Sequence, residues 1–225
     1  MQNQTANVTW RQGDVPVSTQ FDDPYFSLEN GVDETRHVFL TGNDLPRRFC
    51  DGFHIAELGF GTGLNFLTTL QSWQAAGCTG QFEFTSFEAF PMTIDDMSKA
   101  ISVWDTFGDL SAALLDTWQP SGGQFEIAGQ ARLNVIVGDA RETLNPWSGK
   151  ANAWYLDGFS PAKNPELWED DLMAEVARHT ATQGTFATYT AAGFVRRGLS
   201  EAGFEVERIA GYGRKRHMTR GRLAA

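Results

Sequence analysis

FHIAELGFGTGLNFL, residues 53–67, joins a short apolar run to a helix-like pattern through three alternating glycines. The apolar run has the length and composition of a buried strand, and Leu64, Leu67 and Leu70 recur at helical spacing. Glycines between a strand and a helix allow a tight turn and a close approach of the backbone to a ligand. The stretch therefore predicts a strand, a ligand-facing loop and a helix.

Strand and helix patterns alternate along the rest of the chain. Further strands are expected over 82–88, 132–140, 152–159 and 184–190, and helices near 94–104, 110–118, 167–178 and 192–202. Residues 204–220 then predict a strand, a Gly-Tyr-Gly turn and a returning strand. This order predicts an α/β fold with a doubly wound, mostly parallel sheet and an antiparallel C-terminal hairpin.

The residues before Phe53 follow a different pattern. Residues 7–18 alternate around Gly13 and Asp14 and predict a β-hairpin, whereas 21–40 are polar and aromatic without clear periodicity.

The composition limits the class of protein. The chain has 225 residues, 41% hydrophobic residues and a formal charge of -10, so it can bury a core but is not basic overall. Cys50 and Cys78 have no metal-ligand spacing and are interpreted as ordinary thiols, and no metal site is expected. We find no signal-peptide pattern and no run long enough to span a bilayer, so we expect a soluble cytoplasmic protein without membrane partners.

Acidic residues stand at the ends of three successive predicted strands, namely Glu57, Glu88 and Asp139. Ligands of open α/β sheets bind at the carboxyl ends of strands. Glu88 there can accept ribose hydroxyls, and Asp139 can accept from an adenine amino group or cap the next helix. The first loop lacks the third glycine of the dinucleotide fingerprint, since Leu64 takes that position, and its acid-x-G-x-G-x-G pattern suits S-adenosylmethionine. The residues assigned to cofactor binding are Glu57, Gly59, Phe60, Gly61, Gly63, Asn65, Glu88 and Asp139.

A fourth acid, Asp157, ends the apolar part of the predicted strand over 152–159. It stands next to where the methyl group of the cofactor would lie. Phe159, Pro161 and Pro165 follow it and predict an apolar wall and a rigid loop, although a loop acid bonded to backbone amides is the alternative. The tail holds Arg214, Lys215 and Arg216, with Arg220 and Arg222 further on, and no acid among them. This concentration indicates either a phosphate-contacting patch or a solvated edge hairpin.

Six motifs resemble the methyltransferase half of the bacterial tRNA-modifying MnmC family, or its stand-alone form MnmD. They are FDDPYFS (21–27), ELGFGTGLNFL (57–67), SFEAFP (86–91), WYLDGFSPAKNPELW (154–168), AGFVRRGLSEAGF (192–204) and GYGRKRHM (211–218). The resemblance implies a class I S-adenosylmethionine-dependent methyltransferase fold. It also implies methylation of the aminomethyl group on wobble uridine 34, giving 5-methylaminomethyl(-2-thio)uridine in the anticodon loop of tRNA.

On this resemblance Asp157 is the expected catalytic residue, orienting the amine and receiving its proton. The expected substrate-binding residues are Asp23, Tyr25, Phe26, Phe159, Lys163, Arg214, Lys215 and Arg216, with Tyr25 or Phe26 stacking on the base; a structural cap over the sheet is the alternative for 23–26. We expect residues 1–52 to form an N-terminal hairpin and substrate-side extension, and 53–225 the S-adenosylmethionine-binding core.

Two-domain family members continue into a flavin-dependent oxidoreductase, and this sequence shows no second Gly-rich unit. We therefore expect a stand-alone methyltransferase or a fragment of the longer protein, with a separate flavin oxidoreductase acting upstream.

Three other classes remain open. A nicotinamide oxidoreductase would need the dinucleotide fingerprint. An aminopropyl- or methyltransferase acting on a small amine would need an acidic pocket, for which Asp22, Asp23 and Asp157 leave room. A non-enzymatic RNA-binding module would account for the basic tail but not for the strand-end acids.

Overall fold

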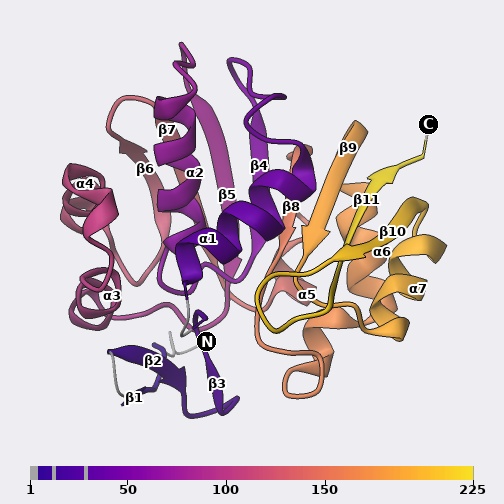
Figure 1. The fold of residues 1–225 in the computed structure, drawn as a ribbon, viewed down its shortest axis with the longest axis horizontal. Coiled ribbons are helices and arrows are strands. Elements are labelled where there is room, and N and C mark those ends of the chain that lie inside the picture. The colour runs from indigo at the N-terminus through magenta and orange to yellow at the C-terminus, as the bar shows by residue number, and fades with distance from the viewer. Residues whose placement is uncertain (1–4, 12–13, 28–29, 225) are drawn as a thin grey trace.

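The structure is a computed structural model that describes residues 5–11, 14–27 and 30–224. Within these residues, one large sheet runs through the molecule in the order β10-β11-β9-β8-β4-β5-β7-β6 (Figure 1). Its strands are β4 (His54–Leu58), β5 (Phe82–Glu88), β6 (Gly123–Ile127), β7 (Ala131–Val137), β8 (Ala151–Leu156), β9 (Thr180–Thr188), β10 (Phe204–Ala210) and β11 (His217–Leu223).

Neighbouring strands from β7 through β5, β4 and β8 to β9 are parallel. Strand β11 lies antiparallel to both β9 and β10, and β6 lies antiparallel to β7 at the opposite edge. The chain order reverses direction at β4, which has β5 on one side and β8 on the other. The prediction of a doubly wound, mostly parallel sheet with an antiparallel C-terminal hairpin is confirmed, and the reversal places a ligand crevice beyond β4 and β8.

Helices cover both faces of the sheet because residues alternate between the faces along each strand. Ile55 and Tyr155 pack on one face with helix α2 (Leu64–Ala75), whereas Ala56 and Trp154 pack on the other with α6 (Asp170–Arg178). The other helical segments after β4 are α3 (Ile94–Ile101), η3 (Asp105–Phe107), α4 (Asp109–Thr117), α5 (Ala140–Thr143), η4 (Pro165–Trp168) and α7 (Gly193–Glu201).

The segment before β4 forms a hairpin and a helix. Strands β1 (Val8–Arg11), β2 (Val15–Ser18) and β3 (Asp23–Pro24) make a small antiparallel sheet, which confirms the two arms of the predicted hairpin. Gln12 and Gly13 of its turn lie outside the described residues. A continuous helical stretch of α1 (Gly31–Thr35), π-helix η1 (Arg36–Leu40) and 3-10 helix η2 (Thr41–Asn43) follows.

Three features differ from the sequence prediction. The stretch over 31–43 shows no periodicity because α, π and 3-10 turns follow one another, so apolar residues do not recur at one spacing. Strand β6 was not predicted, since it is short and largely exposed at the sheet edge. Strand β9 starts at Thr180, four residues before the predicted start at Gly184, and passes an irregularity where Gln183 has φ +60°. No helix in the described part of the chain is long and apolar enough to cross a bilayer.

Candidate active site

A cavity of about 830 Å³ opens at the carboxyl ends of the parallel strands. Residues after β4, β5, β7, β8 and β9 line it from the sheet side. The N-terminal residues 20–21 and 23–27, helix α1 and Lys215 of the turn between β10 and β11 complete the wall. Its volume lies in the range of small-molecule sites, so the crevice is large enough for a cofactor and part of a substrate.

Gly59 and Gly61 of the glycine loop line the cavity, whereas Gly63 is not among its lining residues. Gly59, Gly61 and Gly63 have φ of +87°, +55° and +77°, a region that residues with a Cβ rarely adopt. A Cβ on Gly59 would lie 3.4 Å from the carbonyl oxygen of Asp157, and one on Gly61 would lie 3.2 Å from the ring of Tyr25. The glycines therefore permit both the turn and the close approach of two neighbouring segments. Phe60, by contrast, stacks its ring on Trp118, with centroids 5.1 Å apart.

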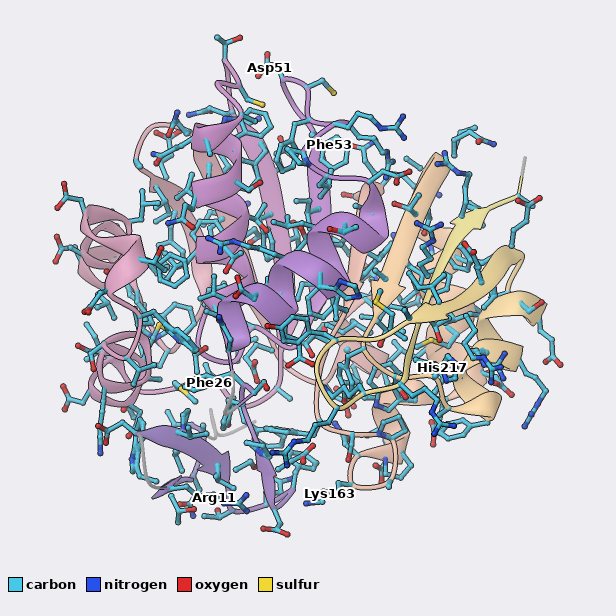
Figure 2. All side chains as sticks on the ribbon, in the orientation of Figure 1. Arg11, Phe26, Asp51, Phe53, Lys163 and His217 are labelled. Atoms are coloured by element: carbon cyan, nitrogen blue, oxygen red, sulfur yellow. The ribbon has the colours of Figure 1, made fainter. Side chains whose placement is uncertain are left out.

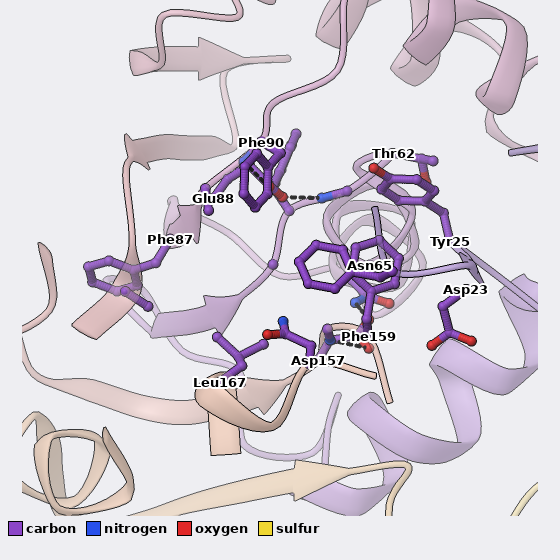
Figure 3. Close-up of a pocket in the computed structure, with 18 of the residues that line it drawn as sticks. Asp23, Tyr25, Thr62, Asn65, Phe87, Glu88, Phe90, Asp157, Phe159 and Leu167 are labelled. Carbon is purple, nitrogen blue, oxygen red and sulfur yellow. Dashed lines mark hydrogen bonds between the residues drawn. The ribbon is translucent and has the colours of Figure 1, made fainter. Parts of the chain in front are cut away.

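Glu88 ends β5 and holds the glycine loop in place (Figure 3). Its Oε2 accepts a hydrogen bond from the amide of Gly61 at 2.8 Å, and its Oε1 accepts from the amide of Phe90 at 2.8 Å. Burial raises the pKa of this carboxyl group, and the backbone bonds oppose that rise. Each carboxylate oxygen can accept a second bond, so Glu88 keeps acceptor capacity for ligand hydroxyls.

Asn65, in the first turn of α2, connects two carboxyl groups. Its Nδ2 donates to Asp157 Oδ2 at 2.7 Å (Figure 3). The same nitrogen donates to Glu57 Oε1 at 2.9 Å. Its Oδ1 accepts from the hydroxyl of Thr35 at 2.8 Å, and Ser86 Oγ donates to Glu57 Oε2 at 2.7 Å. These bonds fix the orientation of the amide. Glu57 is fully buried beneath the cavity and is not among its lining residues, so it reaches the site through Asn65.

Asp157 follows β8 and is half-buried in the cavity wall. Its Oδ1 accepts from the amide of Gly158 at 2.8 Å. Burial raises the pKa of Asp157 to about 6, against the hydrogen bonds from Asn65 and Gly158, which lower it. Burial likewise raises the pKa of Glu57 to about 8. Asp157 thus faces the cavity with a pKa close to neutral pH, whereas Glu57 lies beneath it.

Aromatic rings cover the opening. Phe159 stacks on Phe21 with centroids 4.7 Å apart, and the edge of Tyr25 meets Phe159 at 5.0 Å. Phe26 also lines the cavity, but it is buried in the core and meets Trp104 edge-on at 5.3 Å. The geometry of Phe26 therefore agrees with the structural-cap alternative.

Ion pairs tie the loop after β8 to the N-terminal sheet. Asp23 Oδ2 accepts from the amide of Ser160 at 2.8 Å, and Lys163 contacts the backbone oxygen and the carboxylate of Asp22. Asp22 also pairs with Arg11 at 3.7 Å, and Figure 2 shows Arg11 and Lys163 at the same end of the molecule. Lys163 is not among the residues that line the cavity, so it acts here as a tether.

Asp139 caps α5 and is already paired. Its Oδ1 accepts from the amide of Arg141 at 2.9 Å, and the guanidinium of Arg141 donates to both carboxylate oxygens. These bonds lower the pKa of Asp139. Both residues line the cavity, so a ligand amino group would share Asp139 with Arg141.

The basic tail divides into two parts. Lys215 lines the cavity, whereas Arg214 and Arg216 are exposed and are not among the lining residues. On β11, Arg220 pairs with Glu207 at 2.9 Å and Arg222 with Asp44 at 3.8 Å. The strand arginines thus match the edge-hairpin interpretation.

Sequence reasoning missed several lining residues, namely Phe21, Glu34, Thr35, Phe90 and Tyr189. Tyr189 directly follows β9, so the strand-end rule that identified Asp157 would also have found it. Glu34 and Thr35 lie on α1, whose local signals are the N-cap Asn30, which accepts from the amide of Asp33, and the acids of its first turn. No group of three or more metal-ligating side chains occurs in the described residues.

The cavity suits an adenosine-containing cofactor without a pyrophosphate. The glycine loop lets a ligand come close to the backbone, and the buried carboxylate of Glu88 offers hydrogen-bond acceptors. The sequence lacks the dinucleotide fingerprint that binds a pyrophosphate. Fold and site together define a class I S-adenosylmethionine-dependent methyltransferase. Residues 105–224 match the family described as S-adenosyl-L-methionine-dependent methyltransferase, and the chain belongs to that family.

Two curated relatives are similar over nearly the whole chain. Both carry the name tRNA 5-methylaminomethyl-2-thiouridine biosynthesis bifunctional protein MnmC. The protein from Aeromonas hydrophila is 44% identical over 235 residues, and that from Pseudomonas aeruginosa is 44% identical over 228 residues. In each case 97% of this chain is covered but only 35% of the relative, so the chain spans about a third of their length.

Solved structures agree on the fold. MnmC2 from Aquifex aeolicus superposes with a TM-score of 0.80 at 24% identity, covering 99% of this chain and 72% of that one. The N-methyltransferase NodS from Bradyrhizobium japonicum superposes with a TM-score of 0.52 at 12% identity, covering 88% and 99%.

Proposed function

We propose that the protein transfers a methyl group from S-adenosylmethionine to the aminomethyl nitrogen of 5-aminomethyl(-2-thio)uridine at wobble position 34 of tRNA. The product is 5-methylaminomethyl(-2-thio)uridine. Relatives at 44% identity are named for the biosynthesis of this nucleoside. The observation that carries the proposal is Asp157, a carboxyl group held in the cavity wall by Asn65 and Gly158.

The chemistry requires a neutral amine. An ordinary alkylamine has a pKa near 10.4, so exposing its lone pair at pH 7 costs roughly 4.6 kcal/mol. When bound, S-adenosylmethionine would supply an electrophilic methyl group carried by a sulfonium. The amine must lose one proton in the process.

Asp157 is assigned as the acceptor of that proton. Its pKa of about 6 makes it a stronger base than an ordinary aspartate while it remains ionised at neutral pH. The bonds from Asn65 and Gly158 hold the carboxylate in one orientation, which favours positioning of the amine for in-line attack.

The cofactor is assigned to the glycine loop and the strand ends. Gly59 and Gly61 would contact its amino-acid part through backbone, and Glu88 its ribose. Gly63 would serve the same site through the turn into α2, where it is the N-cap with φ +77°. Asp139 would accept from the adenine amino group beside Arg141. Phe60 and Glu57 would act from the core, since one stacks on Trp118 and the other bonds Asn65.

The uridine base is assigned to the aromatic cover. Tyr25 and Phe159 offer ring faces and edges at the opening, and unstacked bases bind to such surfaces in single-stranded RNA. Asp23 and Lys163 would hold this cover in place, and Phe26 would support it from the core. Arg214, Lys215 and Arg216 would face the anticodon-loop phosphates.

The division into a substrate-side extension, residues 1–52, and a methyltransferase core, residues 53–225, belongs to the same proposal. So do a cytoplasmic location and a separate or fused flavin oxidoreductase that supplies the amine.

A small-amine substrate is the second candidate, and one observation argues against a polyamine. Asp22, which would have contributed to an acidic pocket, is paired with Lys163 and Arg11 instead.

The test is methyl transfer from labelled S-adenosylmethionine to bulk tRNA from cells that lack this protein, followed by nucleoside analysis. Label in 5-methylaminomethyluridine at position 34 is expected. No label with aminomethyl-bearing tRNA, despite cofactor binding, would overturn the tRNA assignment and favour the small amine.

A further inference from the structure

Lys215 reaches into the cavity from the turn between β10 and β11. Its Nζ lies 2.7 Å from Glu34 Oε1 on α1 and 4.2 Å from the ring centroid of Tyr189 after β9. Lys215, Glu34 and Tyr189 all line the cavity. The ammonium group therefore sits between a carboxylate and an aromatic face, which are the two kinds of group that bind primary ammonium ions.

The two groups that hold this ammonium belong to the rigid part of the site. The hydroxyl of Tyr189 donates to the backbone oxygen of Gly158 at 2.7 Å, which fixes the ring beside the loop of Asp157. The side chain of Glu34 is only 14% exposed. A carboxylate buried to this degree needs a cationic or hydrogen-bonding partner, since leaving it unpaired is costly.

Lys215, in contrast, can leave when another cation takes its place. Its side chain is 45% exposed and reaches Glu34 from an exposed turn, so its ammonium group can return to water. Another primary ammonium group could therefore take the place of the Lys215 ammonium beside Glu34. A neutral group in that place would leave the carboxylate of Glu34 without a cationic partner.

Lys215 and the proposed proton acceptor, Asp157, line the same cavity. The charge of Lys215 lowers the pKa of Asp157, and the charge of Glu34 raises it. The Lys215 ammonium thus occupies the kind of position that the aminomethyl group of the substrate must reach.

We propose that Glu34 and the face of Tyr189 form a primary-ammonium subsite beside Asp157, which Lys215 fills until the substrate amine displaces it. The subsite rests on the proposed function and adds to it the groups that recognise the amine before its proton is removed. It selects a primary ammonium over an uncharged substituent at the same position of the base.

The test measures binding of the nucleoside 5-aminomethyluridine to the full chain in the presence of S-adenosylhomocysteine. The nucleoside has no phosphate, so loss of a tRNA-phosphate contact does not affect the result. Removal of the competing cation in Lys215→Met is expected to tighten binding at least fivefold. Glu34→Gln, which keeps the shape but not the charge, is expected to weaken binding at least fivefold. Uridine is expected to bind these variants no differently from the parent chain.

Lys99 offers a matched control. It is 46% exposed, pairs with Asp14 at 3.3 Å and lies 4.1 Å from the ring of Trp10, but it is not among the cavity-lining residues. Lys99→Met should therefore leave nucleoside affinity unchanged.

Equal or weaker nucleoside binding to Lys215→Met, undetectable binding to it at millimolar nucleoside, or unaltered binding to Glu34→Gln would overturn the subsite. The proposed function is judged separately by tRNA methylation with the parent chain. Methylated tRNA with unchanged nucleoside affinities rejects only the subsite, whereas the expected affinity changes without tRNA methylation uphold the subsite and reject the tRNA substrate.

Discussion

Asn65 Nδ2 lies 2.7 Å from Asp157 Oδ2 and donates a hydrogen bond to it. The same nitrogen donates to Glu57, which is buried beneath the cavity, and the amide oxygen accepts from Thr35 of α1, so two further residues fix the orientation of Asn65. The hydrogen bond lowers the pKa of Asp157 against the effect of burial. Asn65 is therefore a positioning residue that sets both the direction and the basicity of the carboxylate.

Asn65→Ala should move the acidic limb of the kcat/KM profile upward from about pH 6, because Asp157 loses a bond that favours its charged form. Stability should fall by about 1–3 kcal/mol, since buried partners lose their hydrogen bonds. The profile is measured between pH 5 and 9 with tRNA as substrate.

Asn43→Ala is the control for this variant. Asn43 is fully buried and bonds Phe39 of η1, Trp154 of β8 and Thr185 of β9, but it is not among the cavity-lining residues. We expect a similar loss of stability and an unmoved pH profile. An acidic limb that stays in place in Asn65→Ala would remove the assigned role of Asn65.

Asp157→Ala should lower kcat more than tenfold while S-adenosylmethionine affinity changes little. The carboxylate is assigned to the proton of the amine and not to the cofactor, so the loss should appear in the chemical step. Single-turnover kinetics give the rate, and titration with S-adenosylhomocysteine gives the affinity. A variant that turns over at the original rate would eliminate Asp157 as the proton acceptor.

Glu57→Gln should reduce the loss of stability at alkaline pH. The folded-state pKa of Glu57 is about 8, against 4.5 as its ordinary value, so between these values the folded chain holds a proton that the unfolded chain lacks. Stability therefore falls as pH rises through this window, by up to about 1.4 kcal/mol per unit. Asp157 adds to the fall only up to about pH 6.

Urea unfolding at pH 6.5 and pH 8 isolates this contribution of Glu57 from that of Asp157. The parent chain should lose up to about 2 kcal/mol over this interval, and Glu57→Gln should lose clearly less. Parallel changes in the two proteins would mean that Glu57 is already ionised in the folded chain.

The strand ends could be predicted from sequence, but the contacts made across the cavity could not. Glu88 and Asp157 follow apolar runs of strand length, and parallel strands bring such ends together whatever the details of packing. Lys215 and Glu34, by contrast, are 181 positions apart, and their contact depends on how a hairpin turn folds over α1. No local pattern contains that information.

The same limit explains why Lys163 and Phe26 have neighbours that the sequence did not predict. Lys163 has the chemistry of a phosphate contact, but Asp22 lies close enough to pair with it. Phe26 has the chemistry of a base-stacking residue, yet Trp104 packs against its ring. In both cases the neighbour comes from a segment whose fold is irregular, so the pairing depends on tertiary structure.

Gly61→Ala should lower the affinity for S-adenosylhomocysteine at least tenfold. Gly61 has φ +55°, and an added Cβ would lie 3.2 Å from the ring of Tyr25, so the loop or the ring must shift at the cavity floor. The strained backbone alone costs about 1–2 kcal/mol of stability. Gly52→Ala is the matched control, because Gly52 has φ +73° with nothing within 4 Å of its Cβ position and is not among the lining residues. It should lose similar stability and keep its affinity, as measured by thermal unfolding and calorimetric titration. Equal affinities in the two variants would show that the close approach at Gly61 does not serve cofactor binding.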